Sequence, residues 1–199
     1  TPIPRTLAIS VYGDLSMSVL DELPPGRKDV ATRWVRRKEL ARLYDFVRTE
    51  AMAGHQVYWV CPVIEESESQ NVTSVLERYE NLRETFADLR VGLMHGQLKS
   101  GDKDEVYEDF VGGRLDILVS TSVIEVGIDV SNATTMVIED AHRFGLSQLH
   151  QLRGRVGRGS HKSYCFLLGE PSTPEGVERL KVLCATQSGF DIAESDLRL

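Results

Sequence analysis

Cysteine, long apolar runs and export signals are scarce or missing in this 199-residue sequence. Its three cysteines, Cys61, Cys165 and Cys184, lie far apart and form no CxxC pair, which argues against a disulfide framework or a zinc site. The longest apolar runs, such as residues 57–64, stop far short of the roughly 18–20 residues that a membrane span needs. The N-terminus has no signal-peptide pattern. We therefore expect a cytoplasmic chain with one core and no membrane partner.

The common nucleotide and hydrolase motifs are also absent. The sequence contains no GxxxxGK[ST], no Gly-Lys pair and no GxGxxG after a strand, so it lacks the usual glycine loop for nucleotide phosphates. It contains no GxSxG, HExxH or paired Cys-His arrangement either. A hydrolase that is complete in this chain is therefore not expected.

Negative charge is missing from one stretch of an otherwise acidic chain. The 23 Lys and Arg against 30 Asp and Glu give a net charge of −7, which argues against binding to phosphates. Residues 141–169, however, contain no acid and five cations: Arg143, Arg153, Arg155, Arg158 and Lys162. A second basic cluster at 27–42 is most simply a solvated face.

Short β-rich runs alternate with helical stretches, which predicts an α/β fold with a parallel sheet covered on both faces. We expect strands at 7–12, 57–63, 91–95, 116–121, 134–139 and 163–168, with a weaker one at 33–36. We expect helices at 38–53, 72–87, 101–111 and about 174–185, the first three with apolar residues on one face.

The most informative segment is QLHQLRGRVGRG at 148–159, where three arginines alternate with glycines. Guanidinium groups match phosphate oxygens, and Gly154 and Gly157 allow another surface to approach the backbone. The alternative is a basic surface helix followed by a turn. It is disfavoured because each glycine costs a helix about 1 kcal/mol. The pattern indicates arginines presented to a polyphosphate.

A second segment, 120–133, follows the predicted strand 116–121. Ligands of open α/β sheets bind outside the carboxyl ends of the strands, so Thr121, Ser122, Gly127 and Asp129 are candidates to face one. The carboxylate of Asp129 is a candidate acceptor for a ribose hydroxyl. Taken alone, a Gly-x-Asp after a strand is more often a turn, and only the arginine segment favours the functional interpretation.

Five stretches carry a resemblance that covers essentially the whole chain. They are TPIPRTLA at 1–8, VYWVCPVIEESE at 57–68, MHG at 94–96, STSVIEVGIDV at 120–130 and FGLSQLHQLRGRVGRG at 144–159. In collinear order they resemble motifs of the superfamily 2 DNA helicases, and within them the RecG family of branched-DNA translocases. The transcription-repair coupling factors are the next most similar.

The resemblance implies that residues 1–170 form a RecA-like (P-loop NTPase-like) domain, the second motor domain of a helicase. Residues 171–199 would begin a helical translocation element that is truncated here. Thr1 would be the last residue of a Thr-Ala-Thr motif, so the first motor domain, with its Walker A lysine and DExH box, and the wedge domain are expected upstream. ATP and Mg²⁺ would be held mainly by that first motor domain.

The resemblance also implies roles for individual residues. Those matching the family's QxxGRxGR and the end of its motif V would contact the nucleotide: Arg155 and Arg158 as arginine fingers, with Gln151, Gly154, Gly127 and Asp129. Those expected to contact DNA are His95, Gly96, Gln97, Thr121 and Ser122. Arg143 and Gln148 would belong to the translocation element. Gln97-Leu98 and Ser131 depart from the family's usual Arg-Met and Pro, and the first departure concerns an expected DNA contact.

The partners implied are branched or duplex DNA, the upstream domains in cis and single-strand-binding protein, in a bacterial, nucleoid-associated monomer. Two alternatives remain: a stand-alone module that grips nucleic-acid phosphates without nucleotide chemistry, and a Rossmann-like domain for a small metabolite. The missing glycine fingerprint makes the metabolite-binding domain the weakest of the three.

Overall fold

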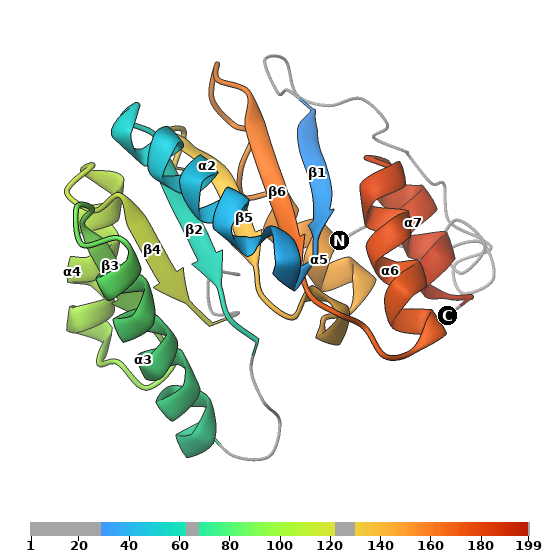
Figure 1. The fold of residues 1–199 in the computed structure, drawn as a ribbon, viewed down its shortest axis with the longest axis horizontal. Coiled ribbons are helices and arrows are strands. Elements are labelled where there is room, and N and C mark those ends of the chain that lie inside the picture. The colour runs from blue at the N-terminus through green and yellow to red at the C-terminus, as the bar shows by residue number, and fades with distance from the viewer. Residues whose placement is uncertain (1–28, 63–67, 122–129, 199) are drawn as a thin grey trace, which may run out of the picture.

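A single sheet of six parallel strands organises the molecule (Figure 1). The computed structural model describes residues 29–62, 68–121 and 130–198. The strand order is β1-β6-β5-β2-β4-β3. The strands are β1 (Val30–Val35), β2 (Gln56–Val60), β3 (Val91–Met94), β4 (Ile117–Ser120), β5 (Ala133–Ile138) and β6 (Ser163–Leu168). The α/β prediction is confirmed, while the expected strand at 7–12 lies outside the described residues.

Helices cover both faces of this sheet. They are α2 (Leu40–Met52), α3 (Glu68–Thr85), α4 (Ser100–Val111), α5 (Leu146–Arg153), α6 (Pro174–Ala185) and α7 (Gly189–Asp196), with short 3₁₀ turns η1 (Arg37–Glu39) and η3 (Ala141–Arg143). Helices α2 and α3 pack on one face, and α4 to α7 pack on the other. Helix α6 has the predicted bounds, whereas α5 and α7 were not predicted.

The two faces form two core layers because side chains alternate along each strand. In β2, Val57 and Trp59 join the layer under α2 and α3, while Tyr58 and Val60 join the layer under α4 to α7. All five residues of β2 are buried, as expected for a central strand covered on both faces.

Among the side chains that the structure describes, the apolar residues expected to face inward do so with one exception, while the side chain of Val72, also expected inward, lies outside that description. Leu43, Val47 and Ala51 of α2 are buried, and Phe110 of α4 is fully buried. Leu76 of α3, expected inward, is 41% exposed. Residues 75, 79, 82 and 86 already form one stripe at helical spacing, and Leu76 lies about 100° around the helix from Val75.

The C-terminal helices belong to the same core as the sheet. Leu180 and Leu183 of α6 and Ile192 of α7 are fully buried in the layer that contains Leu149 of α5. Residues 171–198 are therefore packed on the sheet rather than around a core of their own. No helix within the described ranges is long and apolar enough to cross a membrane.

Candidate functional site

The segment 154–159, called here the arginine turn, leads from α5 to β6. Helix α5 ends at Arg153 with Gly154 as its C-cap, and the amide of Arg155 still donates to the Leu152 carbonyl at 3.0 Å. Gly157 has φ of +81°, a left-handed conformation that disfavours any residue with a Cβ. A glycine is therefore required at position 157, between the two candidate fingers, Arg155 and Arg158.

The three arginines of residues 148–159 differ in their burial and contacts. Arg153 is only 2% exposed, and its Nη1 donates to the carbonyl oxygens of Leu183 at 2.8 Å and Thr186 at 2.9 Å. The interpretation that all three arginines are presented to a polyphosphate is thus wrong for Arg153. Its charge instead satisfies carbonyl groups at the C-terminus of α6, which have no partner within that helix.

Arg155 and Arg158 remain accessible on the turn. Arg158 is exposed and Arg155 half-buried, and Nε of Arg158 donates to the Gly154 carbonyl at 3.0 Å. Burial raises the pKa of the Tyr58 hydroxyl, and the positive charges of Arg155 and Arg158 oppose that rise. Gln151, half-buried in the last turn of α5, precedes them on the same helix.

The arginine turn lies toward the amino ends of β5 and β6. It immediately precedes β6, and Gly159 packs against the main chain of Ser131, two residues before β5 begins. Val130 is buried in the core layer under α5. Ser122, Gly127 and Asp129 lie outside the described residues.

His95 and Thr121 meet at the opposite, carboxyl edge of the sheet. They follow the neighbouring strands β3 and β4, whose last residues Met94 and Ser120 stand opposite each other in register. His95 is 8% exposed and Thr121 4% exposed. The structure thus brings these two predicted nucleic-acid contacts together, as the carboxyl-end rule predicts.

The turn after β3 is held by local contacts. The Leu98 amide donates to the His95 carbonyl at 3.2 Å, and Lys103 of α4 donates to the Gly96 carbonyl at 2.7 Å. Gly96 and Gln97 are both exposed. Burial, with the nearby charge of Lys103, lowers the pKa of His95, so its imidazole is neutral at pH 7.

Arg143 and Gln148 flank the start of α5, near the carboxyl end of β5. Both side chains are exposed, and Gln148 Oε1 accepts from the amide of Gly145 at 3.1 Å. Helix α6 reaches the same turn, because Arg179 donates to the His142 carbonyl at 3.4 Å. The turn η3, α5 and α6 are therefore in direct contact.

A polar cluster directly after β5, formed by Glu139, Trp59 and Arg78, was not predicted from the sequence. Glu139, directly after β5, accepts from Trp59 at 2.8 Å and from Arg78 of α3 at 2.5 Å. Burial raises the pKa of Glu139 against the opposing charge of Arg78. The sequence signal that could have indicated this cluster is an acidic residue directly after a predicted buried strand.

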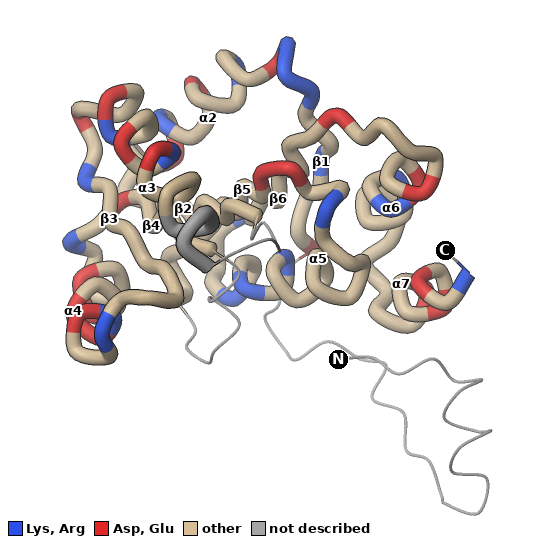
Figure 2. Tube along the Cα trace, turned by 90° about the horizontal axis from the view of Figure 1, so that it is seen from below, with Lys and Arg blue, Asp and Glu red and all other residues tan. Residues whose placement is uncertain are grey.

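Basic residues also gather between β1 and α2, where Figure 2 shows the longest basic stretch of the described chain. Arg33 is paired there with Glu39 at 2.8 Å and is 64% exposed, which fits the expected solvated face. Across 29–62, 68–121 and 130–198, no group of three or more His, Cys, Asp or Glu side chains could hold a metal ion. Mg²⁺ therefore has no evident ligand set in this part of the chain.

Comparison with known proteins gives a consistent result. Residues 38–160 match the model of the helicase conserved C-terminal domain. The whole chain is 51% identical to 29% of the ATP-dependent DNA helicase RecG of Bacillus subtilis (strain 168), and 53% identical to 26% of RecG of Thermotoga maritima. The chain thus spans less than a third of the curated relatives it matches.

Solved structures agree on the fold. A structure of RecG bound to a three-way DNA junction superimposes with a TM-score of 0.83 at 50% identity, covering 99% of this chain and 26% of that one. A structure of Saccharomyces cerevisiae Dbp5 bound to RNA and ADP BeF3 superimposes with a TM-score of 0.59 at 16% identity over 94% of this chain and 46% of that one, a likeness of fold alone. The chain belongs to the helicase conserved C-terminal domain family, has the RecA-like fold of a second helicase motor domain, and is similar along its whole length to part of RecG.

Proposed function

We propose that this chain is the second motor domain of an ATP-dependent DNA helicase that remodels branched DNA, such as replication forks and Holliday junctions, in recombination and repair. About half of its residues are identical to RecG over its full length, and one RecG structure holds a three-way DNA junction. The observation that carries the proposal is the difference among the three arginines: Arg153 is buried, while Arg155 and Arg158 lie on a turn that contains the left-handed Gly157.

The reaction proposed for the complete enzyme is ATP + water to ADP + phosphate, coupled to movement along DNA. A first motor domain, upstream in cis, would hold the phosphates and Mg²⁺. When the two domains close, Arg155 and Arg158 would approach the γ-phosphate and stabilise the charge that develops on it. Gln151, Gly154, Gly127 and Asp129 would complete the nucleotide contacts from this side.

The DNA contacts are proposed at the carboxyl edge. His95, Gly96, Gln97, Thr121 and Ser122 would touch the backbone of one strand there, with His95 acting as a neutral hydrogen-bonding group. Arg143, Gln148 and α6 would begin the translocation element, and the bond from Arg179 of α6 to the His142 carbonyl links α6 to the turn before α5. The functional partners would be the upstream domains, branched DNA and single-strand-binding protein, in a nucleoid-associated monomer.

The arginine assignment is tested in the full-length protein that contains this chain. Arg158→Ala should lower kcat for DNA-stimulated ATP hydrolysis by about 10³-fold or more, the range of arginine fingers, with a much smaller change in nucleotide binding. Arg158→Lys should restore little, because an ammonium lacks the planar fork of donors. The matched control is Arg83→Ala, which removes an arginine that is 54% exposed on α3.

A near-normal kcat for Arg158→Ala would remove the finger assignment. If the same variant then bound DNA more weakly, with a reduced salt dependence and no effect of ATP, the stand-alone nucleic-acid-binding module would be the better description.

A further inference from the structure

Gly159, the residue after Arg158, lies directly on the main chain of Ser131. A Cβ placed on Gly159 would overlap the Ser131 carbonyl oxygen and would lie 3.3 Å from its carbonyl carbon. Gly159 is not among the described glycines with positive φ, which are Gly54, Gly113 and Gly157. The requirement at this position is therefore the close approach of two backbones, whereas Gly157 is required for its left-handed conformation.

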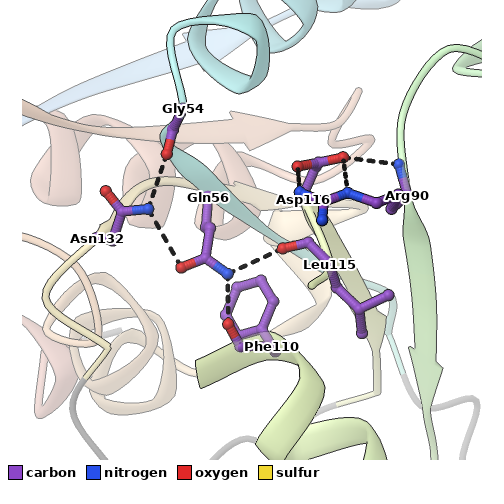
Figure 3. A network of polar contacts seen from close by, with 7 residues as sticks. All are labelled: Gly54, Gln56, Arg90, Phe110, Leu115, Asp116 and Asn132. Atoms are coloured by element: carbon purple, nitrogen blue, oxygen red, sulfur yellow. Dashed lines mark hydrogen bonds and ion pairs between the residues drawn. The ribbon is translucent and has the colours of Figure 1, made fainter. Parts of the chain in front are cut away.

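The segment 130–132 that receives Gly159 is braced from the other side by β2. The Gln56 amide donates to the Asn132 carbonyl at 3.0 Å, and Asn132 Nδ2 donates to the Gly54 carbonyl at 2.8 Å and to Gln56 Oε1 at 3.3 Å (Figure 3). Gln56 is only 3% exposed, so the Gln56 end of this brace lies in the core, while Asn132 is half-buried.

The same glutamine extends the brace to α4. Its Nε2 donates to the carbonyl oxygens of Phe110, in the last turn of α4, at 2.5 Å and of Leu115 at 2.9 Å (Figure 3). The segment 130–132 is thus held between a rigid network on one side and Gly159 on the other. A shift of this segment away from the arginine turn would strain the hydrogen bonds of Asn132.

The contact joins the arginine turn to the described residues that follow Asp129 in the sequence. Arg158 is one residue from Gly159, and Asp129 is two residues from Ser131. Consecutive Cα atoms are about 3.8 Å apart, so Arg158 cannot move far from the contact. The packing of Gly159 on Ser131 therefore constrains the position of the finger candidate Arg158 relative to the segment 130–132.

We infer that Gly159 is a positioning residue, which holds Arg158 in place relative to the segment 130–132 so that Arg158 can reach the nucleotide. This inference rests on the proposed function. A residue with a Cβ at position 159 would push the arginine turn away from Ser131 and displace Arg158 from the developing phosphate charge. Misplacement of a catalytic group by about 1 Å is enough to cost about 10²-fold in rate.

The test is a double-mutant cycle on ATP hydrolysis by the full-length protein. Gly159→Ala should lower kcat by about 10²-fold, but adding it to Arg158→Ala should lower kcat no further, because its effect acts through Arg158. The matched control is Gly101→Ala, where an added Cβ meets no atom within 4 Å, and which should leave kcat unchanged.

Different results overturn different claims. An unchanged kcat for Gly159→Ala, or equal losses in the wild-type and Arg158→Ala backgrounds, would overturn the positioning role and leave the finger assignment in place. An Arg158→Ala enzyme with normal kcat would overturn both. A purely structural role predicts equal losses in the two backgrounds.

A milder variant covers the case in which Gly159→Ala does not fold. Asn132→Ala removes the donor to Gly54 and Gln56 and loosens the same segment from its other side. It should lower kcat in the wild-type background but not in the Arg158→Ala background. Asn81→Ala, an exposed position on α3, is its control. Equal losses in both backgrounds would again overturn the inference.

Discussion

The guanidinium of Arg153 donates to the Leu183 carbonyl at 2.8 Å and thereby ties the end of α5 to the end of α6. A second bond from the same nitrogen reaches the Thr186 carbonyl at 2.9 Å. Arg153 is the last residue of α5, where a positive charge also complements the helix dipole. One side chain thus stabilises the ends of two helices on the sheet face that carries the arginine turn.

Arg153→Met should destabilise the fold by about 3 kcal/mol, because it keeps the aliphatic bulk but leaves buried carbonyl groups without donors. Urea unfolding would measure the change. The control, Arg83→Met, removes an exposed i,i+3 partner of Glu80 and should cost less than about 0.5 kcal/mol. Equal stability of the two variants would show that the Arg153 contacts contribute little.

The burial of Arg153 and the exposure of Arg158 could not be predicted from the sequence. In the string RGRVGR all three have the same local chemistry, and the burial of Arg153 depends on where α6, some thirty residues later, presents its last carbonyl groups. The close packing of Gly159 on Ser131 is equally a property of the folded chain. Glycines in a turn indicate conformational freedom or close approach without distinguishing the two.

The fold was more predictable, because strands buried on both faces are continuous apolar runs. Strand β1 was predicted only as a weaker strand at 33–36, whereas it spans Val30–Val35. Its signal is weak because it is an edge strand whose residues are partly exposed. Helix α5 was missed because its eight residues lead into a glycine-rich turn. His95 was predicted from the family resemblance and Thr121 also from its place after a strand, and parallel pairing of β3 with β4 puts both at one edge of the sheet.

The Asp116–Arg90 pair should make stability depend on pH. Burial of Asp116 acts to raise its pKa, but hydrogen bonds from the Arg90 side chain and amide, with the guanidinium charge, lower it overall. A carboxylate with a lowered pKa stabilises the fold above its unfolded pKa of about 3.9, and this contribution is lost as pH falls through the folded value. Stability should therefore decline below about pH 4.

Asp116→Asn tests this dependence. The variant should be less stable than the parent at pH 7, and its stability should fall less steeply between pH 5 and pH 3, as measured by urea unfolding at each pH. Asp45→Asn, an exposed position on α2, serves as the control and should follow the parent curve. Parallel curves for Asp116→Asn and the parent would contradict the role of the pair.

The 199-residue chain alone should hydrolyse no ATP. It would supply arginines and a ribose contact, but its sequence has no glycine loop for phosphates, and its described residues offer no cluster of metal ligands. A phosphate-release assay with and without fork DNA measures this directly. DNA-stimulated ATP hydrolysis by the purified chain would contradict the proposal that a first motor domain is required.

Asp129→Ala should differ from Arg158→Ala in its kinetic signature. A hydrogen bond from a ribose hydroxyl to Asp129 would be made equally in the ground state and the transition state, so its loss should raise KM for ATP and leave kcat little changed. Arg158→Ala should lower kcat, because its contact would strengthen only as charge develops on the phosphoryl group. Steady-state ATP hydrolysis on fork DNA by the full-length protein separates the two effects. The isosteric Asp129→Asn should show a smaller rise in KM than Asp129→Ala, since its amide oxygen still accepts a hydrogen bond. A fall in kcat at unchanged KM for Asp129→Ala would instead place this carboxylate near the reacting phosphate and remove the ribose assignment.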